Sequence, residues 1–195
     1  MKGNLTKERI IRQALTLFNR FGIKGTSISD LMAATDLEKG GIYRHFANKE
    51  EILEHSIRHY ISLIEERLSI ALDGITSPYK RLCKIIHTFV SIADHPVTPG
   101  GCFIMNIAVD TDFDGTGPHP LVVASFKRWE RLFVREIQRG IEIGEFRGEF
   151  DAKDFAALAI CSIEGSIVLA GVYPRMQSQH IISHHLTHHI ESYLL

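Results

Sequence analysis

Residues 21–51 read FGIKGTSISDLMAATDLEKGGIYRHFANKEE, and this stretch decides the fold of the N-terminal part of the chain. Ser27 and Asp30 have the spacing of a capping box, which predicts a short helix that ends near Thr35. A tight break follows, and a second short helix is predicted at about residues 38–46. Two short helices joined by such a turn are typical of a helix-turn-helix, here at about residues 27–46.

A supporting helix is predicted upstream of this pair. Apolar side chains recur at three- and four-residue steps through residues 6–21 and share one helical face: Ile10, Ile11, Ala14, Leu15, Phe18 and Phe21. Thr6 is placed to cap the start of this helix, and Gly22 is placed to end it. The N-terminal segment is therefore expected to be a three-helix domain with the helix-turn-helix at its end.

The second short helix has an unusual composition for a purely structural element. Gly40 and Gly41 are adjacent, and each costs a helix about 1 kcal/mol relative to alanine. Glycine permits close approach of another molecule to the backbone. Tyr43, Arg44 and His45 follow, and such side chains read base edges or hold phosphates. The pattern favours DNA binding over the alternative of a solvated helix with a loose start.

The stretches at residues 21–31 and 39–51 resemble the signature of the TetR/AcrR family of transcriptional regulators. The resemblance implies a homodimer that binds a palindromic double-stranded DNA operator, with one recognition helix in each half-site. Carried over position by position, it implies the following DNA contacts: Thr26, Ser27, Lys39, Gly40, Gly41, Tyr43, Arg44, His45 and Lys49. Gly41 departs from many family members, which carry a small or polar side chain there, and this weakens direct base readout. Ile42 and Phe46 are expected in the core.

Composition and charge are compatible with this interpretation. The chain has 195 residues, 45% of them hydrophobic, with a formal net charge of -1, which excludes a disordered protein. Residues 1–60 carry ten Lys and Arg against seven Asp and Glu, so the basic part is the one expected to meet DNA. There is no uninterrupted apolar run of about 18 residues and no signal-peptide pattern, so we expect a cytoplasmic protein without a membrane partner.

Beyond the first domain the pattern remains helical. A long helix is predicted from residue 48 to about 72, and further helices at about residues 78–94, 102–110, 118–144, 151–173 and 178–194. The predicted fold is all-α, with a DNA-binding domain at residues 1–53 and a larger effector-binding and dimerisation domain at residues 54–195. In the family the last two long helices form a four-helix dimer bundle, which we expect here; an internal core is the alternative.

A cavity between the helices of the second domain binds a small apolar or amphipathic effector in this family. The aromatic, sulfur and polar candidates for it are Tyr60, Phe89, Cys102, Met105, Asn106, Phe126, Trp129, Phe133 and Glu164. Cys102 follows two glycines at a helix start, where the helix dipole lowers a thiol pKa, and resembles a family subset that senses electrophiles or oxidants. The alternative for Cys102 is a small buried hydrophobic residue.

Two further clusters contain residue types that can bind metal ions. Residues 110–115 begin like a calcium loop, but Leu121 stands where the loop needs its glutamate, so a solvated acidic loop is favoured. Five histidines, which include the i, i+4 pairs 184/188 and 185/189, lie near the C-terminus: His180, His184, His185, His188 and His189. A histidine-rich rim of the dimer interface is favoured over a metal site, and a pH-sensitive dimer is a further alternative. No metal and no cofactor is predicted.

The sequence thus predicts a transcriptional repressor that releases its operator when a small molecule binds the C-terminal domain. A transcriptional activator, or a ligand-independent DNA-binding protein of the same fold, is the alternative. A metal-dependent enzyme is a remote alternative, because no nucleophile, base and orienting group are found together. We therefore do not expect an enzyme.

Overall fold

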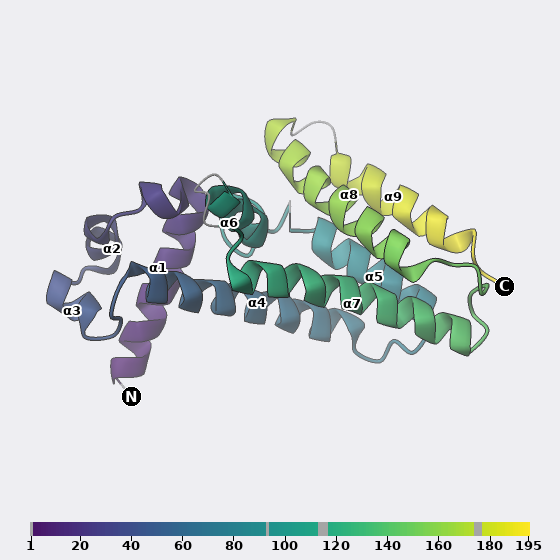
Figure 1. Cartoon of the computed structure of the whole chain (residues 1–195), viewed down its shortest axis with the longest axis horizontal. Helices are drawn as coiled ribbons and strands as arrows, with labels where there is room; N and C mark the ends of the chain where they lie inside the picture. The colour runs from purple at the N-terminus through teal and green to yellow at the C-terminus, as the bar shows by residue number, and fades with distance from the viewer. Residues whose placement is uncertain (1, 93, 113–116, 174–176) are drawn as a thin grey trace. The chain divides into compact units, whose positions relative to one another are not determined.

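Helices dominate the part of the chain that the computed structural model describes, which is residues 2–92, 94–112, 117–173 and 177–195. They are α1 (Lys2–Gly25), α2 (Ile28–Thr35), α3 (Lys39–Tyr43), α4 (Lys49–Leu72), α5 (Pro78–Val90), α6 (Phe103–Asp112), α7 (Pro120–Glu142), α8 (Ala152–Val172) and α9 (Ser178–Glu191) (Figure 1). Within these ranges there is no strand, although an isolated antiparallel bridge joins Phe146 to Leu194. The prediction of an all-α fold is confirmed.

Several predicted helix ends differ from those in the structure. The first helix begins at Lys2, so Thr6 does not cap its start. The fifth ends at Val90, four residues before the expected end. Phe21 was expected in the core and is 54% exposed. The buried face of α1 advances in four-residue steps through Ile10, Ala14 and Phe18, so the next position on it is Gly22 and Phe21 falls at its edge.

The chain divides into two compact units. The N-terminal unit comprises Met1–Ile64 and Val97–Val123, and the C-terminal unit comprises Glu65–Pro96 and Ala124–Leu195. Helices α4 and α7 each contribute to both units. Helix α6 belongs to the N-terminal unit, although its sequence position lies far beyond the helix-turn-helix.

The core of the N-terminal unit joins the first helices to the start of α4 and to α6. Its fully buried apolar side chains include Ile10, Ala14, Phe18, Leu31, Ile42, Ile52, Ile57, Phe103 and Ile107. Burial of such side chains stabilises the unit by about 1.5–3 kcal/mol for each large residue. This core orients α2 and α3 and leaves their outer faces free for another molecule.

The core of the C-terminal unit is rich in aromatic rings. Helix α8 packs on α5 and α9, and α5 also packs on α9. Phe133 and Phe155 meet edge to face with ring centroids 6.2 Å apart. Gly140 lies against Phe146 so closely that a Cβ atom there would stand 2.1 Å from the ring, which requires glycine at this position. Phe133 also lines the pocket described below.

Helix α8 is the helix in the described residues that is long and apolar enough to cross a membrane by length and composition alone. Its 18-residue window has a mean hydropathy of 2.0, although Glu164 interrupts the apolar run. Only 39% of that window is buried inside the chain. Much of the apolar surface of α8 is therefore exposed in the single chain.

Candidate functional site

The first short helix of the motif begins with the predicted capping box. The Ser27 hydroxyl oxygen accepts a hydrogen bond from the Asp30 backbone N–H at 3.2 Å, and the Asp30 carboxylate accepts one from the Ser27 backbone N–H at 2.7 Å. The Ser27 hydroxyl also donates to Asp30 Oδ2 at 2.6 Å, and together these bonds lower the pKa of Asp30. Asp36 then ends the helix in a left-handed conformation with φ 52°.

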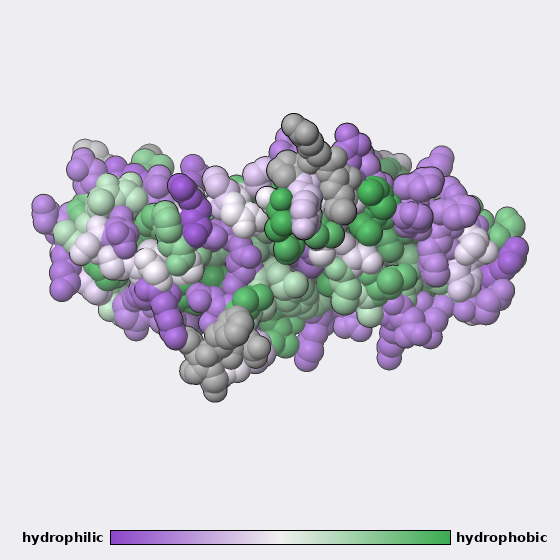
Figure 2. All heavy atoms as spheres, turned by 90° about the horizontal axis from the view of Figure 1, so that it is seen from above, coloured by the Kyte–Doolittle hydropathy of each residue, from purple (hydrophilic) through white to green (hydrophobic). Residues whose placement is uncertain are grey.

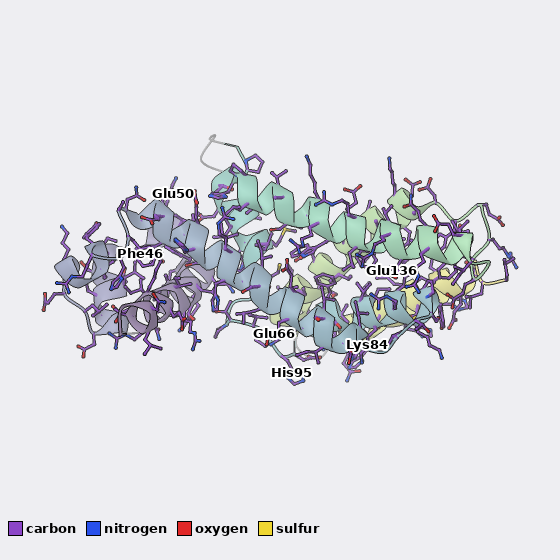
Figure 3. All side chains as sticks on the ribbon, turned by 90° about the horizontal axis from the view of Figure 1, so that it is seen from below. Phe46, Glu50, Glu66, Lys84, His95 and Glu136 are labelled. Atoms are coloured by element: carbon purple, nitrogen blue, oxygen red, sulfur yellow. The ribbon has the colours of Figure 1, made fainter. Side chains whose placement is uncertain are left out.

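The second short helix presents its polar face to solvent. Lys39, Gly40 and Arg44 are exposed, and Tyr43 is 41% exposed, with the Lys39 ammonium 5.9 Å from its ring centroid. Ile42 and Phe46 are 0% and 2% exposed, so both are core residues as predicted. Figure 3 labels Phe46, whose ring lies 5.1 Å from the Lys7 ammonium. The exposed face can reach a partner while Ile42 anchors the helix from behind.

The other predicted DNA contacts have structural contacts within the N-terminal unit. Thr26 is 1% exposed, and its hydroxyl donates to the Gly22 carbonyl at 2.8 Å. The Lys49 ammonium donates to the carbonyls of Ile23 and Thr26 at 2.8 and 3.1 Å, which ties the start of α4 to the end of α1. His45 and Gly41 are half-buried, and Ser27 is exposed. Their contacts with DNA remain predictions.

Gly40 offers a direct test of the recognition helix. A Cβ atom at Gly40 would meet no atom within 4 Å, so packing does not require glycine there. We expect Gly40→Ala to raise the free energy of unfolding by up to about 1 kcal/mol, since alanine favours helix. We also expect it to weaken operator binding about tenfold, because the added methyl holds the backbone away from the DNA.

Chemical denaturation and a DNA mobility shift measure the two effects of Gly40→Ala. A more stable variant that binds DNA less well cannot owe the loss to unfolding. Unchanged DNA affinity would show that the backbone of α3 does not approach the operator closely.

A polar network joins α1 to the loop before α6 and to α6 itself. Asn19, 6% exposed, donates from its side chain to the carbonyls of Pro99 and Gly101 at 3.0 and 3.2 Å. Its side-chain oxygen accepts from Asn106 at 2.8 Å, and Asn106 also donates to the Gly100 carbonyl at 2.7 Å. All of these groups lie in the N-terminal unit. A displacement of α6 must therefore either break these hydrogen bonds or move α1 together with α6.

A second connection lies where α1 kinks. Gly22 adopts φ 76° and ψ 171°, and the next backbone N–H, that of Ile23, donates to the Asp110 carboxylate at 2.6 Å. A Cβ atom at Gly22 would stand 3.2 Å from that carboxylate. The kink of α1 is thus held by a side chain of α6.

Four of the predicted effector residues belong to the N-terminal unit: Tyr60, Cys102, Met105 and Asn106. Tyr60 is fully buried, and its ring meets that of Phe103 edge to face at 5.6 Å. Cys102 precedes α6 and is 4% exposed, which suits the buried hydrophobic alternative and leaves little access for a reagent. Asn106 is part of the network with Asn19.

The C-terminal unit brings another four of the predicted effector residues around one pocket. Its lining consists of Phe89, Trp129, Phe133, Ile160, Ile163 and Glu164, and these side chains nearly fill it, with a cavity volume of about 10 Å³. The rings of Phe89 and Trp129 meet edge to face at 5.4 Å, and Glu164 is 5% exposed. Phe126, the remaining candidate, lies outside the lining and contacts Trp129 edge to face at 5.2 Å. An apolar lining with one polar group is typical of a small-molecule site, but the cavity is far smaller than the roughly 300–1,000 Å³ of such sites, so a ligand would have to move the helices apart.

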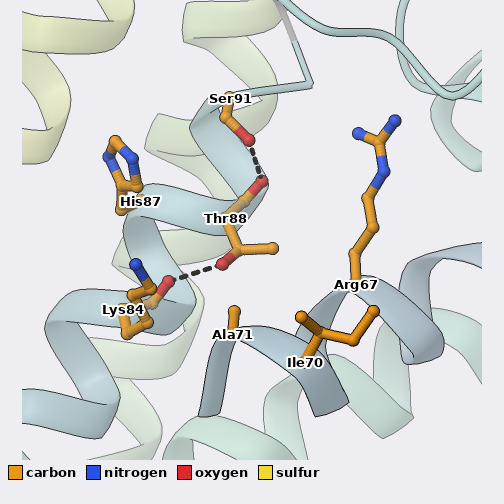
Figure 4. A pocket seen from close by; sticks show the side chains of 7 residues that line it. All are labelled: Arg67, Ile70, Ala71, Lys84, His87, Thr88 and Ser91. Carbon is orange, nitrogen blue, oxygen red and sulfur yellow. Dashed lines mark hydrogen bonds between the residues drawn. The ribbon is translucent and has the colours of Figure 1, made fainter. Parts of the chain in front are cut away.

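The sequence did not predict a basic groove between α4 and α5. Its lining consists of Arg67, Ile70, Ala71, Lys84, His87, Thr88 and Ser91 (Figure 4). Thr88 and Ser91 donate to carbonyls of their own helix, each at 2.7 Å, and Arg67 donates to the His95 carbonyl at 2.7 Å. The sequence does contain a polar stripe on α5 at spacings of three and four residues. Such a stripe is also typical of any solvated helix face, so it does not indicate a groove.

The C-terminal histidines do not form a metal site in the structure. His184 and His188 stack with ring centroids 6.4 Å apart. Among the described residues there is no group of three or more His, Cys, Asp and Glu side chains that could hold a metal ion. Residues 113–116 of the acidic loop lie outside the described ranges.

Comparison with known proteins assigns both parts of the chain. The family model for bacterial regulatory proteins of the tetR family matches residues 10–55, and the model for the tetracyclin repressor-like C-terminal domain matches residues 78–186. The crystal structure of a TetR transcriptional regulator from Chloroflexus aurantiacus is 37% identical, with a TM-score of 0.91, and the match covers 99% of this chain and 98% of that one. A regulator from Cytophaga hutchinsonii is 25% identical, with a TM-score of 0.85 over 100% of this chain and 98% of that one.

A curated relative gives the same assignment. The HTH-type transcriptional repressor DhaR of Mycobacterium sp. is 24% identical over 163 residues, which covers 83% of this chain and 80% of DhaR. The helix-turn-helix at α2 and α3, with its exposed polar face, accords with these matches. The chain belongs to the TetR family of bacterial regulatory proteins and is a DNA-binding transcriptional regulator.

Proposed function

We propose that this regulator is a cytoplasmic repressor that binds a palindromic operator as a homodimer and releases it when a small molecule occupies the C-terminal unit. The observation that carries the proposal is the pocket of Phe89, Trp129, Phe133 and Glu164, enclosed by three helices of that unit. Relatives such as DhaR are named repressors, which supports repression over activation. The proposed DNA contacts are the predicted set, with Lys39, Gly40, Tyr43 and Arg44 as its exposed members on and directly after α3.

The outer face of α8 supports the homodimer. Its exposed apolar side chains follow helical spacing and are 39–60% exposed: Leu158, Val168, Leu169 and Val172. Small or half-exposed residues, among them Ser162 and Gly165, lie between them and permit close helix approach. Figure 2 shows apolar side chains gathered over the C-terminal part of this helix. A second copy of the same face would cover them.

Helix α9 contributes differently from the sequence expectation. Leu186 and Ile190 of its apolar stripe are 4% and 0% exposed within a single chain, so they belong to the internal core. The exposed side of α9 carries the histidines instead, together with Ile181 at 47% exposure. We therefore propose that α8 supplies most of the apolar dimer contact and that α9 supplies its polar rim.

The network between α1 and α6 suggests how release is transmitted. Asn19 and Asp110 tie α1 to α6 and its preceding loop, so a shift of α6 on effector binding would move the helix that supports α2 and α3. A few kcal/mol of difference in effector affinity between two conformations is enough to empty the operator. Helix α4, which contributes to both units, is the second route.

Gly100 tests this coupling. It adopts φ 115°, and a Cβ atom there would stand 2.7 Å from the Asn19 carbonyl oxygen. We expect Gly100→Ala to lower the free energy of unfolding by about 1–3 kcal/mol, because the added methyl forces the loop away from α1. We also expect it to reduce effector-induced release of DNA, because the separated loop no longer connects α6 to α1. Gly74→Ala is the control, since Gly74 has φ 68° and no atom within 4 Å of its Cβ position. Equal effector response of Gly100→Ala and wild type would exclude this route.

Footprinting on the DNA upstream of its own gene, with and without candidate effectors, tests the proposed function. Protection of a palindromic site that an effector abolishes is the expected result. Protection that no effector changes would identify a ligand-independent binder. Loss of transcription after deletion of the gene would identify an activator.

A further inference from the structure

The groove between α4 and α5 has a lining with charge of one sign. Arg67 lies on α4 at one side, and Lys84 and His87 lie on α5 at the other (Figure 4). None of the seven lining residues is an aspartate or a glutamate. A concave surface that carries charge of one sign concentrates ions of the opposite sign. The groove is therefore suited to an anion, and His87 adds to its positive charge whenever the ring is protonated.

The chain itself does not neutralise this positive charge on the α5 side. Neither the Lys84 ammonium nor the His87 ring has a hydrogen bond or an ion pair with another residue in the described part of the chain. Arg128, on α7 of the same unit, is by contrast paired with Glu65 at 2.8 Å. An ordinary solvated helix face carries charges of both signs. The groove differs from such a face because its cations lack acidic partners.

Arg67 is already ordered on the α4 side of the groove. Its guanidinium has five N–H groups, and one of them donates to the His95 carbonyl at 2.7 Å. The other N–H groups remain for a carboxylate, and a side chain that is held in place loses less conformational entropy on binding. The hydroxyls of Thr88 and Ser91 already donate to carbonyls of α5. Recognition of an anion therefore depends on Arg67 and Lys84.

The α4 side of the groove also offers apolar surface. Ile70 is 72% exposed, and Ala71 next to it is half-buried. An apolar group that covers Ile70 removes this surface from water, which favours binding. The cavity volume of about 530 Å³ falls within the range of about 300–1,000 Å³ that is usual for small-molecule sites, whereas the aromatic pocket has about 10 Å³. The groove can therefore take a small ligand without rearrangement of the helices.

We propose that this groove binds an amphipathic anion, a small carboxylate with a compact apolar body, and that this anion is an effector of the regulator. The carboxylate binds Arg67 and Lys84, and the apolar body covers Ile70. Such a ligand contacts α4 and α5 together, and α4 contributes to both units of the chain. The effector role rests on the proposed function, in which a small molecule in the C-terminal unit releases DNA.

Three probes test the class of ligand: cyclohexanecarboxylate, the neutral cyclohexanecarboxamide of nearly the same shape, and acetate, which keeps the charge without the ring. Calorimetry gives their affinities for the free protein. We expect cyclohexanecarboxylate to bind about tenfold more tightly than either of the others. Equal binding of the carboxamide would show that charge does not select the ligand, and equal binding of acetate would show that the apolar body does not. Either result would overturn the inference.

Lys84→Glu tests the position of the site, because it reverses a charge at an exposed residue of the lining. We expect it to weaken cyclohexanecarboxylate about tenfold and to leave the carboxamide unchanged. Lys127→Glu is the matched control, since Lys127 is exposed on α7 outside the lining, and it should stay within about twofold of wild type. Arg67→Gln is the second variant and should weaken the carboxylate about threefold. Equal affinities of Lys84→Glu and Lys127→Glu would show that the anion binds elsewhere.

A mobility shift on the footprinted operator tests the effector role. Saturating cyclohexanecarboxylate should lower the operator affinity of wild type about tenfold, and that of Lys84→Glu at the same concentration by about twofold at most. Binding in the groove without any change in operator affinity would overturn the effector role. Absence of operator binding by the free protein would overturn the proposed function instead, and calorimetry would still decide which ligands the groove binds.

Discussion

Arg81→Ala is expected to lower the free energy of unfolding by about 3 kcal/mol, at the lower end of the range for breaking a buried ion pair. The Glu136 side chain, labelled in Figure 3, is 2% exposed, and the Arg81 guanidinium donates to it at 3.0 Å. The same guanidinium donates to the carbonyls of Leu72 and Ile75 at 3.3 and 3.0 Å, just where α4 ends. Alanine would leave the carboxylate and two carbonyls without these donors.

Arg135→Ala is the matched control for that substitution. Arg135 donates to the same Glu136 carboxylate at 2.9 Å, but its own side chain is 64% exposed. Solvent-exposed pairs contribute about 0–1 kcal/mol, so this variant should stay within about 1 kcal/mol of wild type. Urea denaturation with an unchanged m-value measures both variants. Equal losses in the two would show that burial does not determine the strength of this cluster.

The local parts of the fold could be predicted well because their signals are local. The Ser27 and Asp30 pair specified the start of α2 to the residue, and Pro78 specified the start of α5. The prediction that Phe21 is buried was wrong. A periodicity of three and four residues does not determine which residues at the end of an apolar stripe still lie on the buried face. The exposure of Phe21 follows from the four-residue steps of the buried face of α1 and from the kink at Gly22.

The candidate pocket was less accessible to sequence reasoning. Helical periodicity indicates that Phe89 and Trp129 are buried, but it does not tell which buried rings surround the same void. Four of the nine candidates do line one pocket, whereas Tyr60 and Asn106 pack in the other unit, with Phe103 and Asn19. The association of α6 with α1 depends on contacts between residues 87 positions apart, and no local pattern indicates them.

Val168→Glu on the outer face of α8 is expected to convert the proposed dimer to a monomer. Val168 is 55% exposed, and its neighbours Leu169 and Val172 are exposed apolar residues as well. In a symmetric contact between two α8 helices the substitution introduces two like charges into one apolar interface, which costs several kcal/mol. Sedimentation should then give the single-chain mass of 22.0 kDa at micromolar concentration, whereas we expect twice that value for wild type.

Ile70→Glu is the matched control for Val168→Glu, since Ile70 is 72% exposed but lies on α4, in the lining of the basic groove. It should remain dimeric and keep wild-type operator affinity. Val168→Glu should lose about 10²–10⁴-fold in affinity for the palindromic operator, because the second recognition helix no longer binds at high effective concentration. Its affinity for an isolated half-site should be unchanged, since α2 and α3 belong to a unit that the substitution does not touch. A dimeric Val168→Glu variant would show that the exposed face of α8 has another partner.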